Sequence, residues 1–257
     1  MIPVVGGSNP LGHPTSPQAA FRDIRAAALA RIETSARGML GSTDPEYLHQ
    51  LRVGLRRLRA ALRAFRELLE RKEVKAIVRP LREISPKLGA ARDWDVLIDR
   101  LGREAGPFKA KRDRARERAR RAVRSRDFER VVARARALRV AETEDSLKRF
   151  GAAALERAHR KLRRQELDFV DPAARHALRI RVKRLRYSVE FFAPAFPRCG
   201  SYLAELKALQ QLLGELNDIA VGRRLAGFEA DERALLRKLD AAWARLGKRA
   251  VFWRAAA

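Results

Sequence analysis

The segment DPEYLHQLRVGLRRLRAALRAF, residues 44–65, aligns without gaps on DPAARHALRIRVKRLRYSVEFF, residues 171–192. Nine of the 22 aligned positions are identical, and they include one histidine and three arginines. Apolar residues recur in both segments at the three- and four-residue spacing of a helix that buries one face. Asp44 and Asp171 are predicted N-caps, each followed by a proline at the first helical position. The two segments therefore predict a pair of matching amphipathic helices.

The repeat extends beyond these helices. LGAARD at 88–93 aligns with LGELND at 213–218, and AAALAR at 26–31 aligns with AAALER at 152–157. The offsets agree closely, so we expect a whole half of the chain to be duplicated. Because Ala, Leu, Arg and Glu dominate, the predicted fold is all-α. We expect two pseudo-symmetric four-helix bundles, with a basic cavity between or along them.

The predicted boundaries follow the glycines and prolines. Residues 1–17 are predicted to be a flexible tail, 18–140 the first four-helix repeat and 141–253 the second. Pro80 and Pro86 predict a kink or a late helix start in the third helix. Cys199 is the single cysteine, so no internal disulfide is possible. Without a signal-like start or a long apolar run, we expect a cytoplasmic protein with no membrane partner.

The chain is strongly basic. It has 57 Lys+Arg against 31 Asp+Glu, which gives a formal charge of +26. One interpretation is an anionic partner, and the other is a set of solvated basic faces without a specific ligand. In residues 109–139 the basic residues surround the predicted helix. This segment is interpreted as a solvated outer helix, which leaves open whether it contributes to binding.

Cations align along one side of each repeated helix. At about 100° per residue, the first helix carries a stripe about 80° wide. We expect this stripe to hold a chain of phosphates, because arginine can bind phosphate oxygens with two parallel hydrogen bonds. The alternative is again a solvated face. The stripe residues are His49, Arg52, Arg56, Arg59 and Arg63 in the first helix and His176, Arg179, Lys183 and Arg186 in the second, where Tyr187 lies beside them.

The third helix of each half predicts a second polar face. Arg82 and Arg92 lie on it in the first half, and Lys207 lies on it in the second. Gly89 and Gly214 occupy matching positions, where a missing Cβ lets either a ligand or a partner helix approach. Asp93 and Asp218 are expected to orient neighbouring arginines.

No catalytic pattern or cofactor motif is recognised in the sequence. His49 and His176 have no His, Cys or carboxylate three or four residues later, and cations surround them, so we predict a phosphate donor or a structural hydrogen bond rather than a metal ligand. Phosphate loops, dinucleotide-binding glycine turns and nucleophile elbows are missing from the sequence. We therefore expect a protein that is not an enzyme and needs no cofactor.

These motifs resemble the CHAD family, the conserved histidine α-helical domain. HQLRVGLRRLR at 49–59 and HALRIRVKRLRY at 176–187 are similar to its histidine–arginine pattern. LGAARDWDV at 88–96 and LQQLLGELND at 209–218 are similar to its later segments. The resemblance covers about residues 18–253. It implies two four-helix bundles around a basic cavity that binds inorganic polyphosphate, and for some members a location at polyphosphate granules.

Two functions remain in competition. The first is non-catalytic binding of inorganic polyphosphate by the cations named above. The second is non-specific binding of nucleic acid, or a granule-architectural role, through the same charge. Single-strand binders usually interleave aromatic and basic residues for base stacking, whereas only Tyr187 lies beside the stripe. The sequence therefore favours a ligand without bases.

Overall fold

The computed structural model describes residues 16–164, 168–227 and 230–254. Within these ranges the chain forms nine α-helices and four short 3-10 helices, with no strand. The all-α prediction is confirmed. The predicted tail lies outside the described residues up to residue 15, and its last position, Pro17, is already helical.

The first half contains five α-helices. Ser16 and Asp44 are the N-caps of the first two helices. The Ser16 side chain accepts a hydrogen bond from Ala19 N, and the Asp44 side chain accepts one from Glu46 N. Helices adjacent in the sequence pack on each other, and α5 also reaches back to α1. The helices are α1 (Pro17–Gly41), α2 (Pro45–Ala64), α3 (Arg71–Leu101), α4 (Lys109–Val123) and α5 (Arg126–Ala137), with η1 (Arg66–Leu68) and η2 (Gly102–Phe108) between them.

The second half contains four α-helices. Asp171 caps the helix that matches α2, and it accepts hydrogen bonds from Ala173 N and Ala174 N. Each helix packs on the next one along the chain. They are α6 (Leu147–Arg163), α7 (Pro172–Phe192), α8 (Gly200–Ala226) and α9 (Arg233–Lys248), with η3 (Ala193–Ala195) and η4 (Pro197–Cys199) before α8.

Two local predictions were wrong in part. A kink or a late helix start was predicted at Pro80 and Pro86, and the late start is contradicted, because α3 begins at Arg71 and continues through both prolines. The kink stays a prediction. The single outer helix expected over 109–139 is broken after Val123, where the Ser125 side chain caps α5. Its first part is not solvated all round, because Ala115 and Ala119 are fully buried. Alanine every fourth residue gives α4 a narrow apolar face with which it packs on α3.

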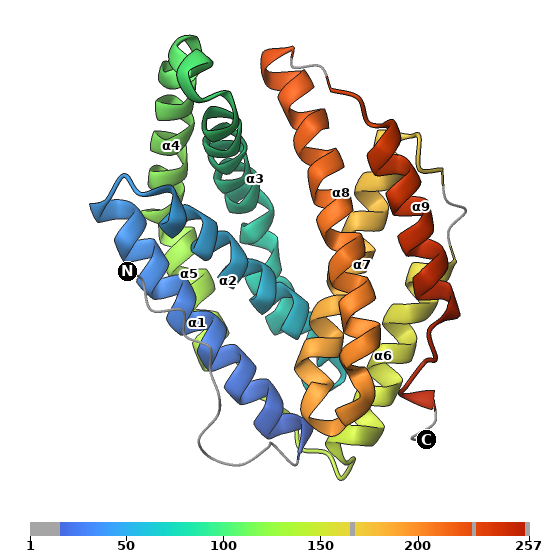
Figure 1. Ribbon diagram of the computed structural model, residues 1–257. Helices are drawn as coiled ribbons and strands as arrows, with labels where there is room; N and C mark the ends of the chain where they lie inside the picture. The colour runs from blue at the N-terminus through green and yellow to red at the C-terminus, as the bar shows by residue number, and fades with distance from the viewer. Residues whose placement is uncertain (1–15, 165–167, 228–229, 255–257) are drawn as a thin grey trace.

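The two halves meet mainly along α2 and α3 of the first half and α7 and α8 of the second. In Figure 1, α1–α5 lie on one side of the molecule and α6–α9 on the other. Helix α2 contacts α7, and α3 contacts α8. The arrangement brings the two segments that match in the sequence next to each other at the boundary between the halves.

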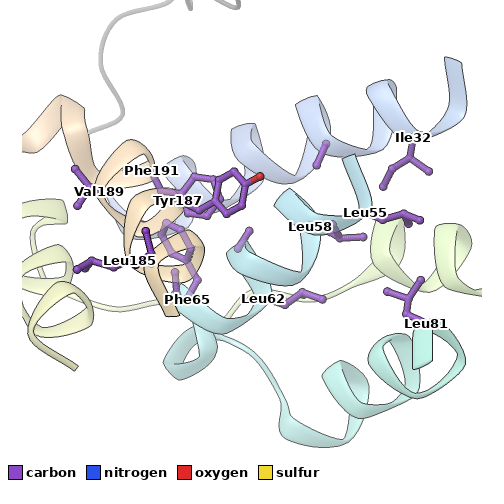
Figure 2. Close-up of a cluster of buried hydrophobic side chains, with 14 of the residues drawn as sticks. Ile32, Leu55, Leu58, Leu62, Phe65, Leu81, Leu185, Tyr187, Val189 and Phe191 are labelled. Atoms are coloured by element: carbon purple, nitrogen blue, oxygen red, sulfur yellow. The ribbon is translucent and has the colours of Figure 1, made fainter. Parts of the chain in front are cut away.

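Aromatic rings join α2 to both α6 and α7. The Phe65 ring is fully buried, and its centroid lies 5.0 Å from that of Phe192 and 5.7 Å from that of Phe150. Phe21 of α1 completes the cluster at 5.4 Å from Phe65. Figure 2 shows Phe65 among side chains of α7, including Phe191. Phe65 and Phe192 occupy matching places in the aligned segments, so the same position of each segment supplies the contact.

Removing this ring should destabilise the protein severely. Phe65→Ala leaves a cavity between three helices, and such truncations typically cost about 3–5 kcal/mol. Thermal unfolding followed by circular dichroism measures the loss. Val170→Ala is the control, because Val170 is 74% exposed. An unchanged melting temperature in Phe65→Ala would contradict the role given to this cluster.

Candidate functional site: an arginine-lined central cavity

A cavity of about 1070 Å³ lies between α2, α3, α7 and α8, and Leu235 of α9 also borders it. We call it the central cavity. Its lining includes six arginines and two histidines against three carboxylates. The ionisable lining residues are His49, Arg52, Arg56, Arg92, Asp93, Arg100, His176, Arg179, Glu215, Asp218 and Arg224.

Helical spacing places the α2 and α7 residues. His49, Arg52 and Arg56 are three and four residues apart, so they share one face of α2. His176 and Arg179 repeat the arrangement on α7. With Arg92 of α3, six of the thirteen predicted binding residues line the cavity. The two helices contact each other, so their stripes contribute to one space.

The remaining residues of the α7 stripe lie beyond the cavity lining. Lys183 is one turn after Arg179, and its charge interacts with Arg179, Arg56 and Asp218. Arg186 Nε donates a 2.6 Å hydrogen bond to Gln210 of α8. Arg186 also pairs with Glu190 on its own helix. These bonds hold the guanidinium against α8, where it can extend the basic surface of the cavity.

Tyr187 packs in the hydrophobic core. Only 3% of it is exposed, and its ring stacks on Phe191 at 6.3 Å between centroids. Arg186 covers the ring from 4.4 Å, and Arg57 of α2 lies 5.7 Å from it. Arg57 also forms a 3.0 Å ion pair with Glu190. The tyrosine therefore belongs to the junction between α2 and α7.

Four predicted cations lie away from the cavity. Arg59, Arg63, Arg82 and Lys207 are exposed and are not among the residues that line it. Arg63 lines a different groove, near the end of α2. The α2 stripe is therefore divided, because its first part faces the central cavity and its end does not.

Burial sets the electrostatics of the cavity arginines. It lowers the pKa of Arg52, and although Asp93 opposes this shift, Arg56 and Arg179 reinforce it. Burial also lowers the pKa of Arg179, with Asp218 opposing. Arg56 Nε and Arg179 Nε are buried, and neither has a hydrogen-bond partner among the described residues. Buried donors without acceptors are costly, so a ligand rich in acceptor oxygens would be stabilised here.

Carboxylates and an imidazole complete the site. Arg224 Nη2 lies 3.7 Å from Asp93 Oδ2, and Arg179 donates a 3.3 Å hydrogen bond to Asn217. Burial raises the pKa of Asp93, while the arginines around it favour its charged form. Burial, and then Arg92, lower the pKa of His49. A neutral imidazole can still donate one hydrogen bond to an anion.

Gly89 leaves space for an arginine. A Cβ built there would lie 3.0 Å from Arg52 Nη1, whereas one at Gly214 would meet nothing within 4 Å. The sequence offered ligand approach or helix packing as reasons for these glycines. For Gly89, the contact in the structure is with the guanidinium that lines the cavity.

The sequence reasoning missed two lining arginines. Arg224 lies seven residues after Asn217, which is two turns along the same face of α8. Arg100 lies eight residues after Arg92 on α3. Both arginines could have been predicted by continuing the polar faces of α3 and α8 by two further turns. They were overlooked because neither residue has a basic counterpart in the other half, where the aligned positions are Asp99 and Leu225.

Comparisons with known proteins show the family of the chain and its fold. The CHAD domain model matches residues 23–227. The chain belongs to the CHAD domain family. The crystal structure of the CHAD domain from the plant Ricinus communis has a TM-score of 0.67 and 28% identity, over 94% of this chain and 90% of that one. PptA from Streptomyces chartreusis, at 19% identity and a TM-score of 0.60, covers 91% of this chain and 99% of its own, and it shares the fold.

A curated relative is longer than this CHAD chain. An uncharacterized protein of Mycobacterium tuberculosis is 30% identical over 251 residues, which cover 86% of this chain. The chain spans about half the length of that relative, 48%. In the part of the chain that the structure describes, no helix is long and apolar enough to cross a membrane.

The two glycines give a direct test of the cavity arginine. Gly89→Ala should stabilise the helix by roughly 0.5–1 kcal/mol but displace Arg52, and so weaken binding of a phosphate polyanion. Gly214→Ala should give a similar stabilisation without the loss of binding. Isothermal titration with tripolyphosphate and thermal unfolding measure the two effects. Equal affinities in the two variants would show that the position of Arg52 does not matter for the ligand.

Proposed function

We propose that this CHAD domain binds inorganic polyphosphate in the central cavity without catalysing a reaction. The observation that carries the proposal is the convergence of six arginines, from both halves of the chain, on one cavity with three carboxylates. Arginine clusters bind phosphate oxygens through paired, charge-assisted hydrogen bonds. The CHAD family is polyphosphate-related, which supports the same ligand class.

The size of the cavity supports a chain of phosphates over a single one. Its volume of about 1070 Å³ is far larger than one phosphate needs, and residues of α2, α3, α7, α8 and α9 border it. Hydrogen-bond donors to an anion recur along α2 from His49 to Arg56, which corresponds to a rise of about 10 Å. A linear polyanion could interact with successive cations, whereas a single phosphate would leave most of them without an acceptor.

The finer architecture belongs to the same proposal. We infer that the two halves are copies of one helical unit, which enclose the cavity between their matching helices. Contacts between matching residues support this, since Phe65 meets Phe192 and Arg52 interacts with Arg179. In the first half, the fourth helix of the unit corresponds to the divided pair α4 and α5.

Nucleic acid remains the second candidate ligand. The overall charge of +26 would attract it. Base stacking needs accessible aromatic rings, and among the described residues that line the cavity there is one Trp and no Phe or Tyr. That residue, Trp94, is 8% exposed and stacks on Phe108. The lining therefore favours a polyanion without bases.

Cavity arginines should matter more than charge alone. We expect Arg52→Gln/Arg56→Gln/Arg179→Gln to lower polyphosphate affinity by about 100-fold or more, because each lost charged hydrogen bond contributes on the order of 1.5–3 kcal/mol. The matched control is Arg114→Gln/Arg118→Gln/Arg121→Gln on the exposed side of α4, which removes the same charge. Titration at one ionic strength, with helicity checked by circular dichroism, compares them. Similar losses would mean that net charge explains binding.

Competition between polymers tests the choice of ligand. At physiological salt, polyphosphate should displace DNA of equal charge concentration, because the cavity adds specific contacts to the general field. The control triple variant should keep this preference and the cavity variant should lose it. Equal affinity of the wild-type chain for both polymers would instead favour the nucleic-acid function. Because polyphosphate is the proposed ligand, we expect the protein to be located at polyphosphate granules.

Binding should take up a proton at Lys183. Burial, and then Arg179 and Arg56, lower the pKa of Lys183 to about 6, so the amine is mostly neutral at pH 7 without ligand. A bound polyanion raises this pKa, so affinity should fall as pH rises from 6 to 8. Titrations across this range should show a smaller slope in Lys183→Arg, which stays charged. Identical slopes would contradict the proton uptake.

The proposal also predicts that the protein has no hydrolase activity. Incubation with polyphosphate or ATP and magnesium should release no phosphate above a matched control. Turnover that survives repurification and disappears in the cavity triple variant would show that the site is catalytic.

A further inference from the structure

A second basic groove lies at the other end of the α2 stripe. We call it the lateral groove. It has a volume of about 490 Å³ and is bordered by the end of α2, η1, α6 and α7. Four alanines contribute small apolar surfaces, and among the residues that the structure describes no carboxylate lines the groove. Its cations include Arg63 and Arg66, Arg157 and Lys161 of α6, and Arg181 and Arg184 of α7.

The lateral groove is separate from the central cavity. The two share no lining residue. On α7, Arg179 lines the cavity and Arg184 lines the groove, and a separation of five residues turns the helix by about 140° from one to the other. The same helix therefore offers arginines to two spaces on different sides.

The cations of the groove are only partly neutralised. Arg157 forms a 3.0 Å ion pair with Glu67, and Arg66 lies 3.9 Å from the same carboxylate. In the part of the chain that the structure describes, Arg63, Lys161 and Arg184 have no carboxylate within ion-pair distance. Burial, and then Arg63 and Arg59, lower the pKa of Arg184 to about 10. Burial, and then Arg66 and Arg63, lower the pKa of Lys161.

Such a cluster costs folding energy unless an anion occupies it. Like charges held together in a partly desolvated groove repel, and a multivalent anion would replace that repulsion with charge-assisted hydrogen bonds. Cations from α2, η1, α6 and α7 surround the groove, so several faces of one ligand could be bound at once. This arrangement differs from a solvated face, where cations on one helix point outwards.

The internal repeat reproduces only part of the groove. In the aligned half, Glu190 matches Arg63, and Gly54 matches Arg181. Gly54 packs closely on α1, because a Cβ there would lie 2.8 Å from Ile32. Two other groove arginines do have arginine counterparts, because Arg57 matches Arg184 and Arg31 matches Arg157. The matching place therefore keeps part of the charge but lacks the cations at the positions of Arg63 and Arg181.

We propose that the lateral groove is a second binding site for a short run of phosphoryl groups, independent of the central cavity. The choice of a phosphate polymer as ligand rests on the proposed function. The position of the groove rests on its own geometry. A domain with two such sites could bind two chains, or two parts of one chain.

Two lysines allow the sites to be followed separately. Lys161 lines the groove, and Lys183 adjoins the cavity. Acetylation of lysines at pH 8, with and without tripolyphosphate, can be read by mass spectrometry. We expect both lysines to be protected about tenfold, whereas the exposed Lys72 and Lys238 should change little.

Variants then separate the two sites. In Arg52→Gln/Arg179→Gln, tripolyphosphate should protect Lys161 and no longer Lys183. In Arg63→Gln/Arg184→Gln, it should protect Lys183 and no longer Lys161. The groove variant removes cations that repel each other, so it is expected to melt no lower than the wild-type chain.

Each other outcome has a definite meaning. Protection of Lys161 alone would support the groove and overturn the proposed function of the cavity. Protection of Lys183 alone would show that the groove is not a binding site. Equal protection of Lys161 and the exposed Lys72 would show the same, since general electrostatic screening by the ligand would explain both. Loss of Lys161 protection in the cavity variant would show that the groove does not bind independently.

Discussion

The repulsion among the arginines of α2 and α7 is the constraint on which the rest of the structure depends. Arg52, Arg56 and Arg179 are brought near one another at the boundary between the two halves. Such an arrangement is unfavourable by itself, and burial makes it worse. It persists because the same two helices are joined further along, where Phe65 and Phe192 pack in one aromatic cluster. The Arg57–Glu190 ion pair adds a polar contact beside it. The hydrophobic contacts between α2 and α7 therefore hold their cations in place.

Much of this architecture could be predicted from the sequence, because helices follow local rules. Asp44 and Asp171 cap the two repeated helices as their sequence positions suggest. The stripe of His49, Arg52 and Arg56 reaches one cavity because residues three and four apart share a helix face. The predictions were less good where tertiary packing decides. Helix α3 begins at Arg71 and continues through Pro80 and Pro86, and no local rule decides between this outcome and the late start that the sequence also allowed.

The site itself shows the same limit. The angles of residues around one helix do not show which part of a basic stripe will contact another helix. Arg56 and Arg63 lie at nearly the same angle on α2, yet they line different spaces because α2 passes from one neighbour to another along its length. Tyr187 lies beside the stripe by angle and is nevertheless buried, since Arg186 and Phe191 cover its ring. Side-chain placement here depends on where helices cross, which is a property of the whole fold.

The carboxylates of the central cavity have a consequence for ion exchange. Asp93 and Asp218 are counter-ions that belong to the protein, since both interact with Arg52 or Arg179. An incoming phosphate chain would have to share those arginines with the two aspartates, instead of displacing only salt from solution. The number of small ions released on binding would then be lower than the number of arginines contacted. A flexible basic tail releases its counter-ions into the solvent when it binds a polyanion. In this fold two counter-ions are side chains of the protein, so they stay beside the arginines and can pair with them again when the ligand dissociates.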